Sequence, residues 1–186
     1  MPLILSFRAR SLATMKLRLA PLLLGTVLLV GAAPSQEPSK EPTWEQAVAA
    51  LYAVISGPVD QERDWEAFVA MFAASGNLMV SIPTPEGSSR LLVLTPEEYV
   101  ERSGAMVTSM GFTEKEIGRR AERFGNVVQV FSSYEGKAAA SPEREPMRGV
   151  NSIQLVRTAE GWKIANLLYE QASALNPLPE ALLTVR

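Results

Sequence analysis

The fold is decided by the second half of the chain, which reads RFGNVVQVFSSYEGK over residues 123–137, RGVNSIQLVRTAEG over 148–161 and WKIANLLYEQ over 162–171. In each segment β-branched and aromatic residues recur with the spacing of a strand, and turn or polar residues separate one segment from the next. The sequence therefore predicts three consecutive antiparallel strands.

Two segments with helical spacing open the domain. Thr43 is a good N-cap, and Gln46 can complete a capping box, so we expect a first helix that ends at residues 57–58. Asp64 is expected to cap a second helix, whose apolar positions are Trp65, Phe68, Val69 and Phe72.

The middle of the chain joins these helices to the three strands. We expect a turn at residues 76–77, strands over 78–82 and 91–94, and a third helix that begins after Thr95 and ends at Gly111. A half-exposed strand over residues 112–124 then leads onward, and a last short helix is expected near Leu178, Leu182 and Leu183.

Length and composition favour one globular domain. The chain has 186 residues, of which 47% are apolar and 20% charged, and no internal repeat is visible. Residues 34–42 are polar and rich in proline, which is typical of a flexible spacer. We therefore expect the domain over residues 43–175 and a tail over 176–186.

Residues 1–33 are predicted to be a signal peptide. They carry four basic residues and no acidic one, and they end in an apolar run too short to cross a bilayer comfortably. Cleavage is expected between Ala32 and Gln36, and Met15 would be a more typical initiator than Met1. The alternative is an uncleaved membrane anchor. The signal peptide predicts export to the periplasm or secretion. Because the chain lacks cysteine, the exported protein can have neither disulfides nor thiolate metal sites.

The charge of the expected mature domain argues against nucleic acid as a partner. Without residues 1–33, 14 basic and 20 acidic residues remain, which is a formal charge of about −6. Anionic membranes are equally poor partners for such a domain, so membrane contact is expected only through the signal segment.

The order helix, helix, strand, strand, helix and four strands resembles the NTF2-like superfamily, and within it an uncharacterised bacterial exported subgroup of SnoaL-like proteins. The segments that carry the resemblance lie at residues 65–72, 94–99, 111–112, 123–126, 130–132, 134–135 and 148–155. The resemblance implies an α+β cone, in which a curved, mostly antiparallel sheet wraps around three N-terminal helices. It implies little about activity, because many functions occur on this fold.

The absence of histidine removes several kinds of site. Neither a Ser-His-Asp triad nor a histidine metal site can be built, and we expect no cofactor and no metal. The resemblance implies a histidine in relatives at the position of Gln129. We expect Gln129 to face the cone interior, with Phe131 and Ser133 on the same side. If the histidine of relatives transfers protons, this chain has lost that group, because an amide cannot replace it. The alternative is a hydrogen bond within the sheet.

Isomerase chemistry of the ketosteroid isomerase type would need a carboxylate and a tyrosine. The acids near apolar surroundings are Asp60, Asp64, Glu122, Glu135 and Glu170, and the phenols are Tyr52, Tyr99, Tyr134 and Tyr169. No spacing among them is diagnostic. Capping and exposed positions explain these acids better than catalysis does.

Arginines and glutamates alternate along residues 112–124, which usually indicates pairing on a solvated face. Glu114, Glu116 and Glu122 belong to this pattern. Because neighbours on a strand point to opposite sides, either Arg119 or Arg120 could face the cavity and bind an anionic group.

Two predicted strands are apolar on both faces, so each face needs a cover. Helices can cover one face, and a second copy of the chain is expected to cover the other, as the resemblance implies. If the face of Gln154 and Val156 meets the partner, lysine at either position is expected to weaken the homodimer. The alternative is a monomer with this face in water.

The leading hypothesis is an exported domain, non-enzymatic or weakly catalytic, that binds a small, mostly apolar molecule. Its expected lining residues are Trp65, Tyr99, Met106, Gln129, Asn151 and Trp162. One alternative is a lyase or isomerase that uses a carboxylate and a tyrosine, and another is a dimeric interaction module with a filled cavity. An acid inside an empty cone would favour the enzyme.

Overall fold

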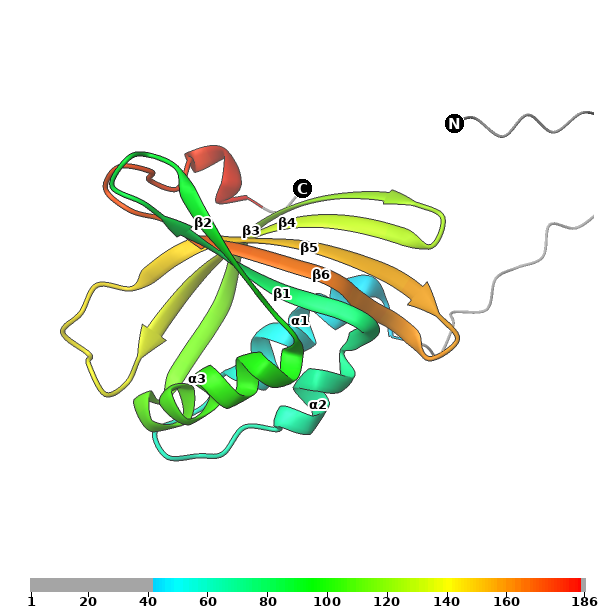
Figure 1. The fold of residues 1–186 in the computed structure, drawn as a ribbon, viewed down its shortest axis with the longest axis horizontal. Helices are drawn as coiled ribbons and strands as arrows, with labels where there is room; N and C mark the ends of the chain where they lie inside the picture. The colour runs from blue at the N-terminus through cyan, green and yellow to red at the C-terminus, as the bar shows by residue number, and fades with distance from the viewer. Residues whose placement is uncertain (1–41, 185–186) are drawn as a thin grey trace, which may run out of the picture. The chain divides into compact units, whose positions relative to one another are not determined.

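A computed structural model describes residues 42–184 of the chain (Figure 1). The predicted signal peptide and nearly all of the predicted spacer lie outside the described residues. The helices and strands follow one another as α1 (Trp44–Ile55), α2 (Trp65–Ala70), β1 (Phe72–Pro83), β2 (Ser89–Leu94), α3 (Pro96–Met110), β3 (Phe112–Phe124), β4 (Val127–Ala138), β5 (Met147–Thr158), β6 (Gly161–Gln171) and η1 (Glu180–Leu182). No helix of the described residues has the length and apolar character needed to span a membrane.

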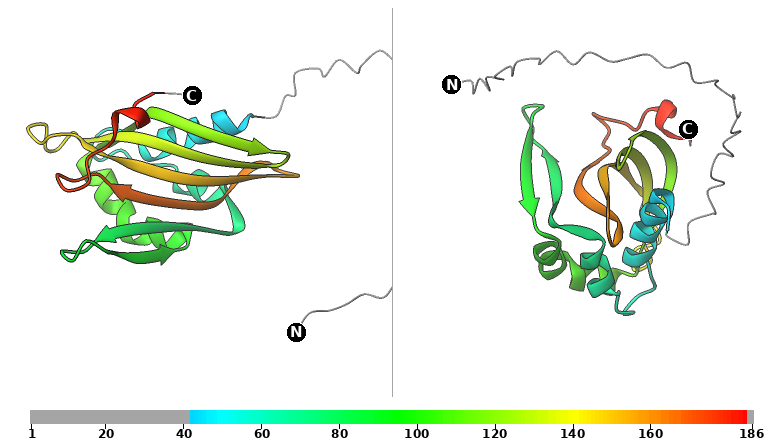
Figure 2. Two further views of the ribbon diagram at one scale, coloured as in Figure 1. Left: turned by 90° about the horizontal axis from the view of Figure 1, so that it is seen from above. Right: turned by 90° about the vertical axis from the view of Figure 1, so that its right-hand side faces the viewer.

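The six strands form one curved sheet in the order β2-β1-β6-β5-β4-β3. Every neighbouring pair is antiparallel except β1 and β6, which run parallel. All three α-helices lie on one side of the sheet and η1 lies on the other (Figures 1 and 2). The expected α+β architecture, a curved and mostly antiparallel sheet around three helices, is confirmed.

Local capping signals fix both long helices. At α1 the side chains of Thr43 and Gln46 form the expected capping box, with Gln46 Oε1 2.7 Å from the Thr43 amide. At α3 Thr95 and Glu98 form a second box, and Gly111 ends the helix in the left-handed conformation with φ 62°. These caps satisfy backbone groups that would otherwise lose their partners.

The core lies between the helices and the side of the sheet that they cover, which we call the inner face. Its strand side chains include Val128, Val130, Ile153, Leu155, Ile164 and Leu167. The helices add Val48, Leu51, Tyr52, Ile55 and Phe68. Five of these strand residues are no more than 2% exposed, so the core is closely packed at its centre.

A buried arginine fastens the end of α1 to β3. The Arg63 side chain is buried and donates to the carbonyls of Ile55, Gly57 and Phe112, among others. Since α1 has no basic residue in its last turn, Arg63 supplies the cation that complements the helix C-terminus. This contact positions the start of β3, where the cavity begins.

Two expectations for the region after α2 are wrong. Phe72 begins β1 instead of extending α2, and residues 76–77 form an irregularity within β1 instead of a turn before it. A Cβ at Gly76 would lie 2.6 Å from the carbonyl oxygen of Ile164, so the glycine allows β1 to approach β6. Pairing with β6 overrides the local turn signal.

The C-terminal tail crosses the opposite side of the sheet, which we call the outer face. Ser133 Oγ donates to the Leu182 carbonyl at 2.6 Å, and a Cβ at Gly118 would meet that carbonyl oxygen at 1.9 Å. The expected last helix is thus η1. The tail covers part of the outer face, whereas Val127, Phe131 and Gln154 remain exposed.

Candidate functional site

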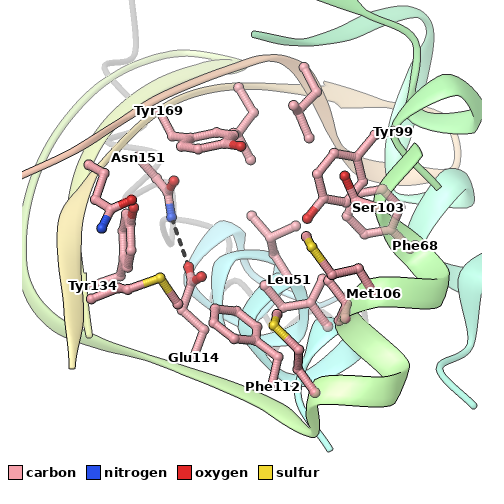
Figure 3. Close-up of a pocket in the computed structure, with 17 residues that line it drawn as sticks. Leu51, Phe68, Tyr99, Ser103, Met106, Phe112, Glu114, Tyr134, Asn151 and Tyr169 are labelled. Atoms are coloured by element: carbon pink, nitrogen blue, oxygen red, sulfur yellow. Dashed lines mark hydrogen bonds between the residues drawn. The ribbon is translucent and has the colours of Figure 1, made fainter. Parts of the chain in front are cut away.

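A cavity of about 290 Å³ lies between the inner face and helices α1 and α3 (Figure 3). Most of its lining is apolar or aromatic: Leu51, Ile55, Phe68, Leu78, Tyr99, Met106, Val107, Met110, Phe112, Tyr134, Met147, Leu167 and Tyr169. Four further lining residues are polar: Ser103, Glu114, Asn151 and Gln171. An apolar cavity with a few polar groups is the usual form of a small-molecule site.

Glu114 is the only carboxylate among the cavity-lining residues. It lies two residues after Phe112 on β3, and this spacing places both side chains on the inner face. Figure 3 shows Glu114 and Asn151 on one side of the cavity, opposite Tyr99 and Met106 of α3. The carboxyl group therefore faces the space that a ligand would fill.

The surroundings of Glu114 favour its neutral form. Burial raises the pKa of this carboxyl group from an ordinary 4.5 to about 7, and the hydrogen bond from Asn151 opposes the rise. The Asn151 amide donates to Glu114 Oε1 at 3.3 Å. At neutral pH the group is thus poised to accept or to donate a proton.

Three tyrosines share the cavity with Glu114. Within residues 42–184, the hydroxyl groups of Tyr99, Tyr134 and Tyr169 make no hydrogen bond to another residue. Burial is the main reason why the pKa of each phenol is raised. They therefore stay protonated at neutral pH and can donate to an oxygen atom of a ligand.

A row of hydrogen bonds, here called the polar chain, joins Glu114 to Arg119 in the middle of β3. Its members are Glu114, Asn151, Tyr52, Ser132, Glu116 and Arg119. Asn151 Nδ2 donates to Tyr52 Oη at 3.1 Å, and Tyr52 Oη lies 2.7 Å from Ser132 Oγ. Ser132 in turn donates to Glu116, which Arg119 holds through two hydrogen bonds of 2.9 and 2.6 Å.

The residues predicted from the sequence to line the cavity divide into two groups. Tyr99, Met106 and Asn151 do line it. Trp65 and Trp162 do not, because Trp65 packs against Gly104 of α3 and Trp162 lies under the Arg123 guanidinium, 5.3 Å from its ring centre. Both tryptophans therefore belong to the edge of the core.

The prediction for Gln129 is wrong. Gln129 does share a face with Phe131 and Ser133, but that is the outer face. Its Nε2 donates to Ser152 Oγ at 3.0 Å, which is the alternative of a hydrogen bond within the sheet. Gln129 does not reach the cavity, so the hypothesis of a lost proton-transfer group at this position is also wrong.

The two arginine candidates lie on opposite faces, as alternation requires, but neither lines the cavity. Arg119 faces inward, pairs with Glu116 and lies over the Trp44 ring, 5.3 Å from its centre. Arg120 donates to the Ala181 carbonyl of the tail at 3.2 Å. Both guanidinium groups are thus engaged by the chain itself.

The acids considered from the sequence have structural roles or are exposed. Asp64 accepts from the Ala67 amide and caps α2, and Glu135 pairs with Lys115 and Arg148. Glu170 accepts from Ser81 and Asn176 on the outer face, and Asp60 and Glu122 are exposed. The described residues contain no group of three or more acidic side chains arranged to hold a metal ion.

Sequence reasoning missed Glu114 because β3 contains a bulge. The pairing of β3 with β4 shifts between Glu116 and Gly118, so the inward positions are 112, 114 and 116 before the bulge but 119 and 121 after it. A single alternation counted back from Ala121 would turn Glu114 outward. The one usable signal was Phe112, an apolar residue two positions earlier.

No protein-family model matches the chain, and no curated protein matches it. Solved structures do. An NTF2-like protein with a cystatin-like fold from Novosphingobium aromaticivorans aligns over 75% of this chain and 85% of its own, with a TM-score of 0.54 and 14% identity. A proposed dehydratase of the NTF2-like family from Streptomyces avermitilis aligns over 70% of this chain and 94% of its own, with a TM-score of 0.52 and 17% identity. A protein of unknown function with a cystatin-like fold from Nostoc punctiforme aligns over 70% of this chain and 90% of its own, with a TM-score of 0.52 and 13% identity.

Proposed function

Because the chain has the NTF2-like fold and its cavity holds a carboxyl group, we propose that the protein binds a small, mostly apolar molecule there and transfers a proton on it, as a lyase or an isomerase does. The observation that carries the proposal is Glu114, a carboxyl group on an apolar cavity wall that also bears three unpartnered tyrosine hydroxyls. The sequence alone favoured binding with weak catalysis or none, since it contains no histidine and did not identify an acid inside the cone. Glu114 supplies that acid.

The chemistry follows from the two forms of Glu114. As a carboxylate it can remove a proton from a carbon next to an electron-withdrawing group. As the acid it can return that proton to another carbon, which is an isomerisation, or to a departing hydroxyl group, which is a dehydration. A pKa of about 7 populates both forms at neutral pH. Dehydration is also the reaction proposed for the Streptomyces avermitilis protein.

The tyrosines supply the complementary group. When a proton leaves carbon beside a carbonyl, negative charge gathers on the carbonyl oxygen, and a hydroxyl donor stabilises it there. Tyr99, Tyr134 and Tyr169 are such donors on the cavity wall. None of the described lining residues is a lysine or an arginine, so the cavity suits an uncharged molecule better than an anion.

The test compares wild type with Glu114→Gln, and uses Glu122→Gln, an exposed glutamate on the same strand, as the matched control. Small uncharged ketones, enones and hydroxyketones are first screened for binding by NMR, and those that bind are then followed for conversion. We expect Glu114→Gln to bind the same compounds but to convert them at least about 100-fold more slowly than wild type, as the loss of a general acid-base predicts. Unchanged turnover in Glu114→Gln would refute catalysis, and binding without any conversion in wild type would leave a binding protein.

We also propose that the protein is a homodimer through the part of the outer face that the tail leaves open. Val127 and Phe131 on β4 are 53% and 41% exposed, and apolar side chains exposed together on a sheet favour an interface. Gln154 lies exposed on the neighbouring strand of the same face. We further propose that the chain is exported, on the basis of the basic and then apolar residues 1–33.

A further inference from the structure

The donors and acceptors of the polar chain can be ordered from its far end. Glu116 is paired with Arg119, so it is a carboxylate that only accepts hydrogen bonds. The Ser132 hydroxyl must therefore donate to Glu116 and accept from Tyr52. The single hydrogen of the Tyr52 hydroxyl is then used, and its oxygen is left to accept.

This order leaves one choice for Asn151. Only the amide nitrogen can donate to the Tyr52 oxygen, and its second hydrogen then points at Glu114 Oε1. If the amide turned over, its oxygen would face the Tyr52 oxygen and the carboxylate together. Both are acceptors in the present order, so the turned amide would be repelled.

We infer that the polar chain fixes the orientation of the Asn151 amide, and that Asn151 is a positioning residue that holds Glu114 by Oε1 and leaves Oε2 free to reach a ligand. Among the described residues, no hydrogen bond is made to Glu114 Oε2. The inference deepens the proposed function, because the free oxygen is the one that would exchange a proton with substrate. The part of the inference that concerns the orientation of Asn151 and its hydrogen bond to Glu114 does not depend on the protein having an activity.

The chain positions the carboxyl group and does not conduct protons. Hydroxyl groups can pass a proton along, but an amide nitrogen does not exchange one at the required rate near neutral pH, and Asn151 interrupts the row between Glu114 and Tyr52. Arg119 and Glu116 therefore act on Glu114 only by fixing which atoms face it.

Other titratable groups around Glu114 do not replace this control. Tyr52 of α1, Tyr99 of α3, Tyr134 of β4 and Tyr169 of β6 all feel its charge, and each stays neutral because its own pKa is raised. On β3, Lys115 points to the outer face, where it pairs with Glu135. The nearest charged partners on the inner face are thus members of the polar chain.

Ser132→Ala tests the inference, and Ser133→Ala is the matched control. The two serines are adjacent and fully buried, but Ser133 lies on the outer face and bonds to the tail. Loss of the Ser132 hydroxyl frees Tyr52 to donate to Asn151, so the amide can turn its oxygen toward Glu114. That arrangement suits the protonated acid, which can donate, and disfavours the carboxylate.

The readout is the titration of the Glu114 side chain, followed by carbon-13 NMR on the folded protein without any ligand. We expect Ser132→Ala, and Tyr52→Phe as a second variant, to raise the midpoint by about one pH unit, a tenfold gain in proton affinity. Ser133→Ala should leave it unchanged. An unchanged midpoint in both folded variants, or an equal rise in Ser133→Ala, would overturn the inference. Since no substrate is present, this result is independent of whether Glu114→Gln loses turnover.

Discussion

Replacing Glu114 by Gln is expected to stabilise the protein at alkaline pH and to leave its stability unchanged in acid. In the folded chain burial raises the pKa of Glu114 from 4.5 to about 7, so the folded state holds this proton more tightly than the unfolded state does. Between these two values the folded state binds more protons, and stability falls as the pH rises. The stability that the folded state gains by binding this proton more tightly is fully present below pH 4.5 and is lost above pH 7.

The size of the effect follows from the shift. A difference of about 2.5 pKa units corresponds to roughly 3 kcal/mol, because one unit is worth about 1.4 kcal/mol. Gln has the same shape and no charge, so the variant lacks this dependence. At pH 8 we therefore expect Glu114→Gln to be more stable than wild type by about 3 kcal/mol, and at pH 4 to be about equal.

Urea unfolding followed by circular dichroism, repeated from pH 4 to pH 8, measures these differences. The control is Glu122→Gln, which removes an exposed charge from the same strand and should follow the wild-type curve at every pH. If Glu114→Gln and wild type stay parallel across this range, the carboxyl group is not shielded from water. The argument for its perturbed pKa would then fail.

Four further outcomes are expected. Arg63→Met should destabilise the fold by about 3 kcal/mol, since it leaves buried carbonyls without donors; a loss below about 1 kcal/mol in urea would contradict this. Gly118→Val should release the tail, which limited proteolysis would reveal as new cleavage within residues 172–184, and an uncut tail would disprove the contact. Gln154→Lys should weaken the proposed dimer in light scattering, whereas a monomeric wild type at micromolar concentration would rule that dimer out. N-terminal sequencing of protein from fractionated cells should begin near residues 32–36, and cytosolic protein that retains residues 16–33 would exclude export.

The sequence predicted most elements of the fold because their signals are local. The boxes at Thr43 and Thr95, the left-handed Gly111 and the alternation along the last three strands each depend on neighbouring residues. The errors at Phe72 and Gly76 arise where local preference meets a distant partner. The parallel pairing of β1 with β6 draws both residues into the sheet, and no short window of sequence contains that partner.

The site was harder to predict than the fold. Tyr99, Met106 and Asn151 were found because aromatic, thioether and amide side chains on inward positions suit a cavity. The face of β4 was assigned wrongly at Gln129, since both of its faces carry apolar residues and alternation alone does not say which is inner. Glu114 was hidden by the bulge in β3, which depends on pairing with β4.

The titration of Glu114 in the wild-type protein tests the central claim most directly. Carbon-13 NMR of the glutamate side chains, with the signal assigned by its absence in Glu114→Gln, gives the midpoint in the folded protein without a substrate. The structure predicts a midpoint of about pH 7, set by burial in the apolar cavity. A midpoint near the ordinary value of 4.5 would mean that the carboxyl group lies in water, and it would contradict the proposed acid-base role.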